Sequence, residues 1–419
     1  MTPTTYPIFQ PYSILELLFW AALFVVFYTY IGYGLLLYLL VKLKEAFRKP
    51  TTWELPPSEA LPHVTLFITA YNEEEEVDRK MENALALDYP REKLHIVWVT
   101  DGTTDGTNQR LNTRWAGDAT VLYQPERRGK TAAMTRGMKQ IETPIVIFTD
   151  ANTMLNREAV SEMVRAFENP KVGCVAGEKR IAVQTHDGAA AGGEGLYWRY
   201  ESTLKALDAR LYSAVGAAGE LFAVRCELFE EMEHDTLLDD FVLSLRIAMK
   251  GHLIAYCSGA YAVESGSADM REEEKRKVRI AAGGLQSVWR LRELLNPLRY
   301  GVLSFQYVSH RVLRWSVTPV LLFALLPLNV ALVVMGWANA DAPAAVFREA
   351  GTLYTILLAA QVMFYLMGAR GYYLSSRLLK NTYFFIPYYF LFMNINVFKG
   401  IGYLRRKKGT GTWERAKRA

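Results

Sequence analysis

Long apolar stretches lie towards both ends of the chain, whereas the middle alternates between short apolar runs and polar segments. From Ser13 to Val41 nearly every residue is apolar, with Glu16 as an interruption near the start. Val312 to Trp337 and Leu353 to Tyr373 are two further apolar stretches. Because about 20 apolar residues suffice for a helix to cross a bilayer, the pattern predicts three membrane spans that flank a polar domain.

The first apolar stretch has a cleaved signal peptide as its alternative interpretation. It is too long for the apolar region of a signal peptide, no basic residue precedes it, and no small-residue cleavage site follows it. Basic residues follow it at once, namely Lys42, Lys44, Arg48 and Lys49. Since basic residues gather on the cytoplasmic side of membrane helices, we expect a multi-pass protein of the plasma or inner membrane with its polar middle in the cytoplasm.

The segment from Tyr383 to Val397 is apolar but short, and Pro387, Asn394 and Asn396 interrupt it. If this segment crossed the membrane, the basic tail would lie outside the cytoplasm, against the charge rule. We therefore interpret it as a re-entrant or interfacial segment followed by a cytoplasmic tail. The number of spans after residue 380 stays open.

The polar middle alternates between strand and helix patterns. Three apolar runs predict buried strands, namely Val64 to Thr69, Leu94 to Val99 and Ile145 to Phe148. Helical patterns run from Glu73 to Leu87, with Asn72 as a candidate cap, and from Lys130 to Ile141. A linker rich in proline, from Lys49 to Pro62, precedes the first strand. This order predicts an α/β domain with a doubly wound, mainly parallel sheet.

Three more helices are expected after these strands, and the last of them has a distinct pattern. Glu201 to Leu211 and Asp239 to Lys250 are two of them. The third, Glu272 to Leu295, carries basic residues on one face, including Lys275, Arg276 and Arg279, and apolar residues on the other. Such a helix is typical of a membrane interface, and an ordinary surface helix is the alternative.

The composition agrees with a polar domain combined with membrane helices. The chain has 419 residues, of which 51% are hydrophobic and 22% charged. We expect an N-terminal membrane helix (1–48), an α/β domain (60–270), interfacial helices (271–311), a C-terminal membrane region (312–400) and a basic tail (401–419). The net charge of +5 comes with basic residues beside apolar segments, so we expect membrane lipids rather than nucleic acid as partners. Isolated Cys174, Cys226 and Cys257 indicate neither disulfides nor zinc, and suit a reducing compartment.

Acidic residues follow two of the predicted strands. Asp101-Gly102 ends the second strand and Asp150-Ala151-Asn152 ends the third. Ligands of open α/β sheets bind beyond the carboxyl ends of the strands, and hard divalent cations use oxygen ligands that they share with phosphates. The alternatives are ordinary turns at Asp101 and Asp105, and a capped turn at Asp150.

Two more groups belong to the same edge of the predicted sheet. Ala70-Tyr71-Asn72-Glu73 lies where the first strand meets its helix, although Asn-Glu also caps helices. Gly129-Lys130-Thr131 resembles part of a phosphate-binding loop, but position 124 is glutamine where that motif requires glycine. Lys130 remains a candidate contact for a base or a phosphate.

Adjacent acids open the helix at Asp239-Asp240. Such a pair favours one raised pKa, which suits a general base, whereas acids at a helix start also stabilise the helix dipole. Arg311, Arg314 and Trp315 begin the second membrane stretch. They are interpreted either as an interfacial anchor or as a cationic and aromatic lid over a diphosphate.

Together these motifs resemble the family 2 glycosyltransferases, in particular the membrane-embedded branch with cellulose, hyaluronan and poly-N-acetylglucosamine synthases. The resemblance covers roughly positions 60 to 320, and the order of the motifs carries it. The matching segments are Ala70-Tyr71-Asn72-Glu73, Asp101-Gly102, Gly129-Lys130, Asp150-Ala151-Asn152, Gly216-Ala217-Ala218-Gly219, Asp239 to Ser244 and Arg314-Trp315.

The resemblance implies a GT-A fold, a nucleoside-diphosphate sugar donor, Mg²⁺ or Mn²⁺, and inversion at the anomeric carbon. It implies that Asp101 contacts the nucleoside, that Asp150 and Asn152 hold metal and diphosphate, and that Asp240, next to Asp239, is the general base. The other donor contacts implied are Ala70, Tyr71, Glu73, Lys130, Arg311, Arg314 and Trp315. Gly219, Glu220 and Trp315 are the expected acceptor contacts.

The sequence departs from the family pattern in three places. Asn152 stands where the metal motif usually ends in aspartate, which puts the second metal contact in doubt. Leu238 and Asp239 precede Asp240 where threonine and glutamate are usual. Arg311 replaces the glutamine that usually starts the membrane-face motif, which weakens the inference of processive synthesis.

Three functions remain open at this point. The first is a synthase that extends a β-linked polysaccharide, from a donor expected to be a UDP-sugar, and moves it across the membrane alone or with an accessory export protein. The second is transfer of a single sugar to a lipid acceptor. The third is an inactive membrane subunit that binds a partner synthase, against which the intact acids Asp101, Asp150 and Asp240 argue.

Overall fold

A computed structural model describes residues 11–48, 53–182, 189–267, 269–338, 345–375 and 382–406 of the chain. It divides into two compact units. The helical unit comprises Met1–Leu36 and Ser309–Val397, and the sheet unit comprises Leu37–Val308 and Phe398–Ala419. The start of the predicted linker (49–52) and the basic tail from residue 407 lie outside the described residues.

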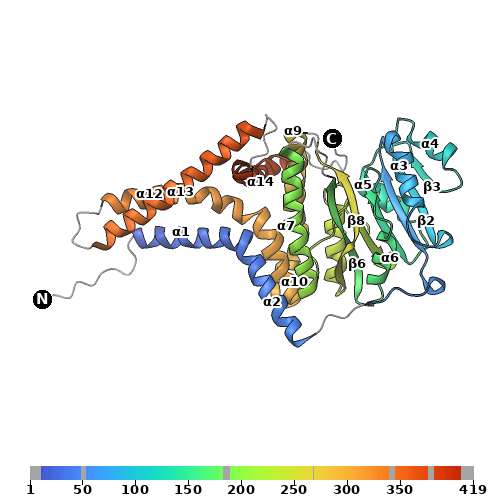
Figure 1. The fold of residues 1–419 in the computed structure, drawn as a ribbon, viewed down its shortest axis with the longest axis horizontal. Helices are drawn as coiled ribbons and strands as arrows, with labels where there is room; N and C mark the ends of the chain where they lie inside the picture. Colours follow the sequence, from blue (N-terminus) through green and yellow to red (C-terminus); the bar gives the residue numbers. More distant parts are fainter. Residues whose placement is uncertain are drawn as a thin grey trace. The chain divides into compact units, whose positions relative to one another are not determined.

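The sheet unit is built on an eight-stranded sheet in the order β3-β2-β1-β4-β7-β6-β8-β5. Figure 1 labels β2, β3, β6 and β8 of this sheet. The first four strands in this order are parallel to one another, β7 is antiparallel to both of its neighbours, and β6 and β8 are parallel again. The strands are β1 (Val64–Ala70), β2 (Leu94–Asp101), β3 (Thr120–Gln124), β4 (Ile145–Asp150), β5 (Met154–Leu155), β6 (Val172–Ala182), β7 (Leu221–Arg225) and β8 (Leu253–Ser265). The expected doubly wound, mainly parallel sheet is therefore confirmed.

Helices cover both faces of this sheet, so its central strands are apolar at successive positions. One face packs Leu66, Ile96 and Ile147 into a common apolar core with helices α3, α4 and α6. On the other face Phe67, Phe148 and Phe222 form a row of ring contacts, with α5 and α8 nearby. These helices are α3 (Glu74–Leu85), α4 (Thr107–Arg114), α5 (Lys130–Met138), α6 (Ala159–Ala166) and α8 (Asp239–Met249).

The element boundaries differ from the sequence-based prediction at a few positions. Strand β3 was not predicted, because Thr120–Gln124 is short, half exposed and lies at the sheet edge. Asn72 is not the cap of α3, since its φ of 53° belongs to the left-handed region and Glu73 occupies the cap position. Helix α7 (Ala189–Leu211) begins well before the predicted Glu201.

Helix α9 (Met270–Arg290) lies in the sheet unit, and its basic residues are not all on an exposed face. Arg276 and Lys277 are buried and form ion pairs with buried Glu273. Arg276 is therefore not exposed, unlike Lys275 on the same helix, and the interfacial interpretation of the helix as a whole stays a prediction. Trp289, at the end of the helix, is exposed. Helix α10 (Pro297–Tyr307) follows after a short 3-10 turn, Arg292–Leu295.

The helical unit packs α12 (Val317–Ala338) against α1 (Pro11–Phe27) and α13 (Ala345–Ser375). Phe19, Leu325 and Leu332 belong to its buried apolar core. The one acid of the first apolar stretch, Glu16, accepts a hydrogen bond from the Tyr354 hydroxyl at 2.9 Å. Since a charge or polar group in a low-dielectric environment requires a partner, this contact explains how the stretch accommodates Glu16.

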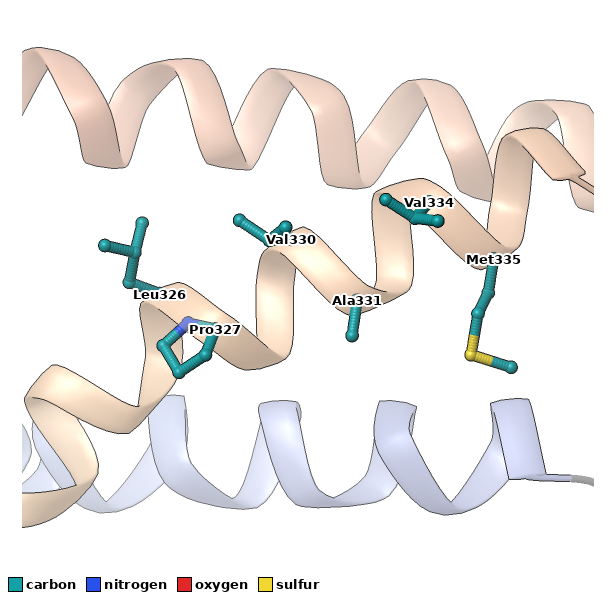
Figure 2. A pocket seen from close by; sticks show the side chains of 6 residues that line it. All are labelled: Leu326, Pro327, Val330, Ala331, Val334 and Met335. Carbon is teal, nitrogen blue, oxygen red and sulfur yellow. The ribbon is translucent and has the colours of Figure 1, made fainter.

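Four helices among the described residues are long and apolar enough to cross a membrane. They are Ile14–Phe47, Val317–Ala338, Gly351–Leu374 and Tyr383–Arg406. The first contains a π-helical segment, Tyr28–Gly32, between α1 and α2 (Tyr33–Phe47). Figure 2 shows a shallow depression along α12, lined only by apolar side chains including Leu326, Val330 and Met335. An apolar surface of this kind is ordinary for a helix in contact with lipid tails.

Helix α14 (Thr382–Arg406) corrects the expectation that the last apolar segment is short. The sequence pattern ended at Val397, but the helix continues through Arg405 and Arg406 despite Pro387 near its start. Its length and composition allow it to cross a membrane, which the sequence alone did not indicate. The side on which the basic tail lies stays a prediction.

A substitution at Gly216 tests how tightly α8 packs on the loop before β7. Its φ of 84° is unfavourable for other residues, and a Cβ atom would lie 2.2 Å from the Phe241 ring. We expect Gly216→Ala to lower the free energy of unfolding by about 2–4 kcal/mol, measured by thermal unfolding of the full chain in detergent. Gly117→Ala is the control, because its Cβ meets no atom within 4 Å. Equal losses in both variants would contradict the packing argument.

Candidate active site

The parallel strands bring the predicted residues together at one edge of the sheet. Ala70 ends β1, Asp101 ends β2 and Asp150 ends β4, and β1 lies between the other two strands. The register places Ala70 opposite Thr100 and Thr69 opposite Asp150. The sheet therefore presents both carboxylates on the same edge, as expected from the sequence.

Asp101 lies in a tight enclosure made by the segment that follows β3. Its Oδ2 accepts hydrogen bonds from the backbone N–H groups of Arg128 at 2.9 Å and Gly129 at 2.6 Å. Its Oδ1 is buried, and no donor among the described residues reaches it. A buried carboxylate oxygen without a donor is costly, so this oxygen is suited to accept a hydrogen bond from a ligand.

The loop after β1 forms the neighbouring side of this enclosure. The Arg127 guanidinium lies 3.7 Å from the centre of the Tyr71 ring. Asn72 accepts a hydrogen bond from Thr104 N at 2.9 Å, and Glu73 N donates to the Thr107 hydroxyl at 2.9 Å. These contacts hold the loop against the turn after Asp101. They place Tyr71 and Glu73 beside Asp101, and contact of Ala70, Tyr71 and Glu73 with a donor stays a prediction.

Lys130 lies among three carboxylates at the start of α5. Its Nζ is 2.8 Å from Asp150 Oδ1 and 3.8 Å from Asp239 Oδ2, and the side chain is 16% exposed. Burial lowers the pKa of Lys130, but the negative charges of Asp150, Asp239 and Asp240 outweigh burial and raise it well above its usual value. Lys130 is therefore a permanent cation that joins the end of β4 to the start of α8.

Asp240 has the properties of a group that exchanges protons near neutral pH. Burial raises its pKa, the adjacent Asp239 raises it further, and Lys130 opposes both, with a result of about 7. A Cβ atom at Gly219 would lie 3.4 Å from Lys130 Nζ and 3.5 Å from Asp240 Oδ2. Gly219 therefore borders the space between this cation and this carboxylate, where a larger residue would intrude.

Glu220, the other predicted acceptor contact, is held by buried cations. Its carboxylate forms ion pairs with Lys179 and, at 3.8 Å, with Arg276. Burial raises the pKa of Glu220, but these two cations outweigh burial and hold it below its usual range. The carboxylate is ionised and oriented by protein groups, so a direct contact of Glu220 with an acceptor stays a prediction.

Asn152, the predicted second metal ligand, faces β8. Its amide nitrogen donates to Glu264 Oε1 at 3.3 Å. Among the described residues, no three His, Cys, Asp or Glu side chains come close enough together to hold a metal ion. Asp150 and Asn152 remain the predicted oxygen ligands at this strand end.

Arg311, Arg314 and Trp315 belong to the helical unit. All three are buried, and the Arg311 guanidinium lies 5.5 Å from the Trp315 ring centre. Both interpretations of Arg314 and Trp315, the interfacial anchor and the lid over a diphosphate, stay predictions. Their roles towards a donor or an acceptor stay predictions.

Two residues of α3 that the sequence analysis did not single out hold the loop of Asp150. Lys80 is fully buried, and its Nζ donates to the Thr149 hydroxyl at 3.0 Å and to Thr153 O at 2.7 Å. Asn83, three residues later, donates to Leu155 O and accepts from Leu155 N, both at 2.8 Å. Together they fix the chain on both sides of Asp150 and Asn152.

Lys80 is unusual for its charge as well as its position. Burial lowers its pKa to about 7, against the opposing effect of Asp150. Its only sequence signal is the helical spacing to Val77, Met81 and Ala84, which are all buried and mark the inward face of α3. A lysine on that face requires polar partners, but the sequence does not identify them.

With this geometry in place, comparison with known proteins identifies the class. Residues 62–283, just over half of the chain, match the family model described as glycosyltransferase like family 2. The chain therefore belongs to the family 2 glycosyltransferases, and the resemblance drawn from its motifs is confirmed. It is a glycosyltransferase related to polysaccharide synthases.

Curated relatives match part of the chain. The poly-β-1,6-N-acetyl-D-glucosamine synthase of Staphylococcus aureus (strain COL) is 27% identical over 208 residues, which are 47% of this chain and 48% of the relative. The synthase of the same description from Staphylococcus epidermidis is 31% identical over 120 residues, 28% of this chain and 29% of the relative. The chain thus matches no more than about half the length of these curated relatives.

A solved structure resembles a larger part of the chain. The mannosyltransferase PcManGT from Pyrobaculum calidifontis, in complex with GDP-Man and Mn²⁺, is 26% identical with a TM-score of 0.59. The similarity covers 83% of this chain and 98% of the mannosyltransferase. The expected GT-A fold is thereby confirmed.

The hydrogen bonds of Lys80 to Thr149 and Thr153 can be tested by comparing substitutions at Lys80 and at its exposed neighbour Arg79. We expect Lys80→Met to reduce sugar transfer roughly 10²-fold, because small displacements of positioning groups have effects of that size. Arg79→Met is the control, since the Arg79 side chain is 57% exposed and pairs with Glu76 of its own helix. Transfer rates and circular dichroism are measured for both variants. Equal rates at equal folded content would show that the Asp150 loop does not depend on Lys80.

Proposed function

We propose that this protein is an inverting, metal-dependent glycosyltransferase that adds sugars from a nucleoside-diphosphate sugar to a β-linked polysaccharide at the membrane. The observation that carries the proposal is the convergence of Asp150, Lys130 and Asp240. A permanent cation lies beside a carboxylate at a strand end, and a second carboxylate that titrates near pH 7 lies beside the same cation. These groups suit a departing diphosphate and a hydroxyl nucleophile, respectively.

The base of this reaction is Asp240. Ionised Asp240 accepts the proton of an acceptor hydroxyl while the hydroxyl oxygen forms a bond to the anomeric carbon of the donor. The bond from that carbon to the diphosphate breaks, and the diphosphate leaves with the electron pair. Attack opposite the leaving group inverts the configuration. Gly219 leaves space for the acceptor beside Asp240.

Different residues are proposed to bind the nucleoside and the diphosphate of the donor. The buried Asp101 Oδ1 would accept a hydrogen bond from the nucleoside, and the Arg127–Tyr71 pair would border it. Lys130 would stabilise negative charge on the departing diphosphate, because a fixed cation in a partly buried site acts more strongly than in water. Arg314 and Trp315 would add a planar cation and an aromatic face, as the family resemblance implies.

The site chemistry fits Mg²⁺ or Mn²⁺. Asp150 offers a carboxylate that is 32% exposed, and Asn152 offers an amide oxygen. Mg²⁺ commonly binds through one or two protein carboxylates together with substrate phosphates and water. The structural relative PcManGT was solved with GDP-Man and Mn²⁺, which supports a metal at the donor diphosphate of this family. When bound, the metal would neutralise charge on the leaving diphosphate.

The acceptor class depends on the relatives and the membrane helices. Relatives named as poly-β-1,6-N-acetyl-D-glucosamine synthases favour a growing polysaccharide and an N-acetylhexosaminyl or hexosyl unit from a UDP-sugar. Transfer of a single sugar to a lipid acceptor is the second candidate. The four apolar helices among the described residues support a multi-pass membrane protein. The basic residues that follow the first of them suit a sheet unit in the cytoplasm. Export of a polymer through this chain or an accessory protein is part of the same proposal. An inactive subunit is disfavoured by the titrating carboxylate Asp240.

The function is tested with the purified full chain and labelled UDP- and GDP-sugars, followed by sizing of the product. We expect transfer from one donor, loss of transfer in excess chelator, and recovery with Mg²⁺ or Mn²⁺. Asp240→Asn should reduce turnover about 10²–10⁴-fold while donor binding persists, because an amide cannot accept the proton. A long product supports the polymer and a single addition supports the lipid acceptor. Absence of transfer from every donor contradicts the proposal.

The pH dependence of transfer tests the base assignment. Asp240 acts in its ionised form, so kcat/KM should fall as the pH decreases through about 7, the pKa to which burial and Asp239 raise it. Asp239→Asn removes a negative charge that raises this pKa, so the acidic limb should move to lower pH. We expect full pH profiles to show this shift. An unmoved limb in Asp239→Asn would assign the titration to another group.

A further inference from the structure

Asn152 stands where the family pattern usually has aspartate, and it contacts a residue on a strand distant in sequence. Strand β5 pairs with β8 through Met154 opposite Val263 and Leu155 opposite Ala262. This pairing brings the residue after Val263, Glu264, against Asn152, whose amide nitrogen donates to Glu264 Oε1 at 3.3 Å. Glu264 is 3% exposed and Asn152 is half-buried. A buried acid therefore lies beside the loop that carries Asp150.

The contact determines which end of the Asn152 amide faces Glu264. The NH₂ group is the only end that can donate to a carboxylate, so the amide oxygen is directed away from Glu264. An aspartate at position 152 would instead place a carboxylate oxygen about where the nitrogen lies. Two carboxylates at that separation in a partly buried site repel each other, which accounts for a neutral amide at this position.

Glu264 is itself fixed from the other side. Lys179 on β6, whose side chain is fully buried, forms ion pairs with both Glu264 and Glu220. Arg276 on α9 also approaches Glu220, at 3.8 Å. Glu264, which contacts Asn152, and Glu220 therefore share one buried cation. The Glu220 carbonyl oxygen also accepts a hydrogen bond from the Thr149 hydroxyl at 3.0 Å, which joins Glu220 to the end of β4.

We propose that Glu264 is a positioning residue of the donor site, which holds the Asn152 amide with its oxygen available to the donor and which requires a neutral residue at position 152. The requirement for a neutral residue at position 152 concerns the protein alone. The positioning of the amide oxygen rests on the proposed function of the Asp150 loop in binding the donor diphosphate and its metal. Positions 152 and 264 therefore form a coupled pair, in which one acid is tolerated and two are not.

A double-mutant cycle tests the pair in the full chain. The variants are Asn152→Asp, Glu264→Gln and the two combined, with Asn169→Asp as a control, since Asn169 Oδ1 accepts from Lys171 N and an aspartate can do the same. Without metal or nucleotide, Asn152→Asp should lower the melting temperature by roughly 3–6 °C, and much less when Glu264→Gln is already present. Asn169→Asp should leave it unchanged. An equal loss in both backgrounds overturns the coupling.

Mn²⁺ titrations in the presence of UDP or GDP then test the positioning role. The combined variant carries an aspartate at 152 without an acid opposite, so its half-saturating Mn²⁺ concentration should be about 3–10-fold lower than that of the unmodified protein. Glu264→Gln alone should raise that concentration, because a neutral glutamine side chain no longer fixes the Asn152 amide as a carboxylate does. Coupling in stability with unchanged Mn²⁺ binding overturns the positioning role. Absence of Mn²⁺–nucleotide binding by the unmodified protein contradicts the proposed function instead.

Discussion

The site depends on the partly buried cation of Lys130. Asp150 comes from a parallel strand, whereas Asp239 and Asp240 open a helix much later in the chain. Without a cation between them, three carboxylates in a partly buried space would repel one another. Lys130 allows Asp150 to stay close to them and also opposes the rise in the Asp240 pKa, which stops at about 7. One ammonium group therefore joins the groups proposed for donor and acceptor chemistry.

The buried cation of Lys179 also lies between acidic groups. Lys179 pairs with Glu220 and Glu264, and α9 adds buried Arg276 and Glu273. Removing one charge from such a group leaves its partners uncompensated, so each member is more costly to lose than an exposed ion pair. The loops of Asn152 and Glu220 are consequently held by rigid, charge-balanced contacts. This rigidity suits a transfer in which a hydroxyl and an anomeric carbon must be aligned.

The candidate membrane helices are distinguished by apolar surface, whereas the candidate active site is distinguished by paired charges. They are long and apolar, and the acid Glu16 within the first of them is paired with Tyr354. The depression along α12 has apolar lining throughout and carries no chemistry of its own. The groups proposed for catalysis, Asp150, Lys130 and Asp240, therefore lie in the sheet unit, while a contribution of Arg314 and Trp315 from the helical unit stays a prediction.

The sequence by itself determined the class of the protein and most of its parts. Apolar runs of strand and membrane length are local patterns, and acids at strand ends follow from the parallel order of the strands. Asp101 and Asp150 could therefore be named as candidates from the sequence alone, and Asp240 from the pair of adjacent acids at a predicted helix start. The short edge strand β3 and the full length of α14 were missed, because an exposed strand and an interrupted apolar helix have weak local signals.

Only the tertiary structure decided which charges meet. Lys80 and Asn83 reach the Asp150 loop from helix α3, and Glu264 contacts Asn152 across a strand pairing. Likewise, the sequence pattern placed Arg276 on an exposed basic face, whereas its acidic partners hold it in the interior. Ion pairs and hydrogen bonds act over a few ångströms in space, even between residues as distant in the chain as Asn152 and Glu264, which are 112 positions apart. Local sequence patterns do not show which distant residues lie close together in space, so only the folded structure reveals which buried charges form pairs.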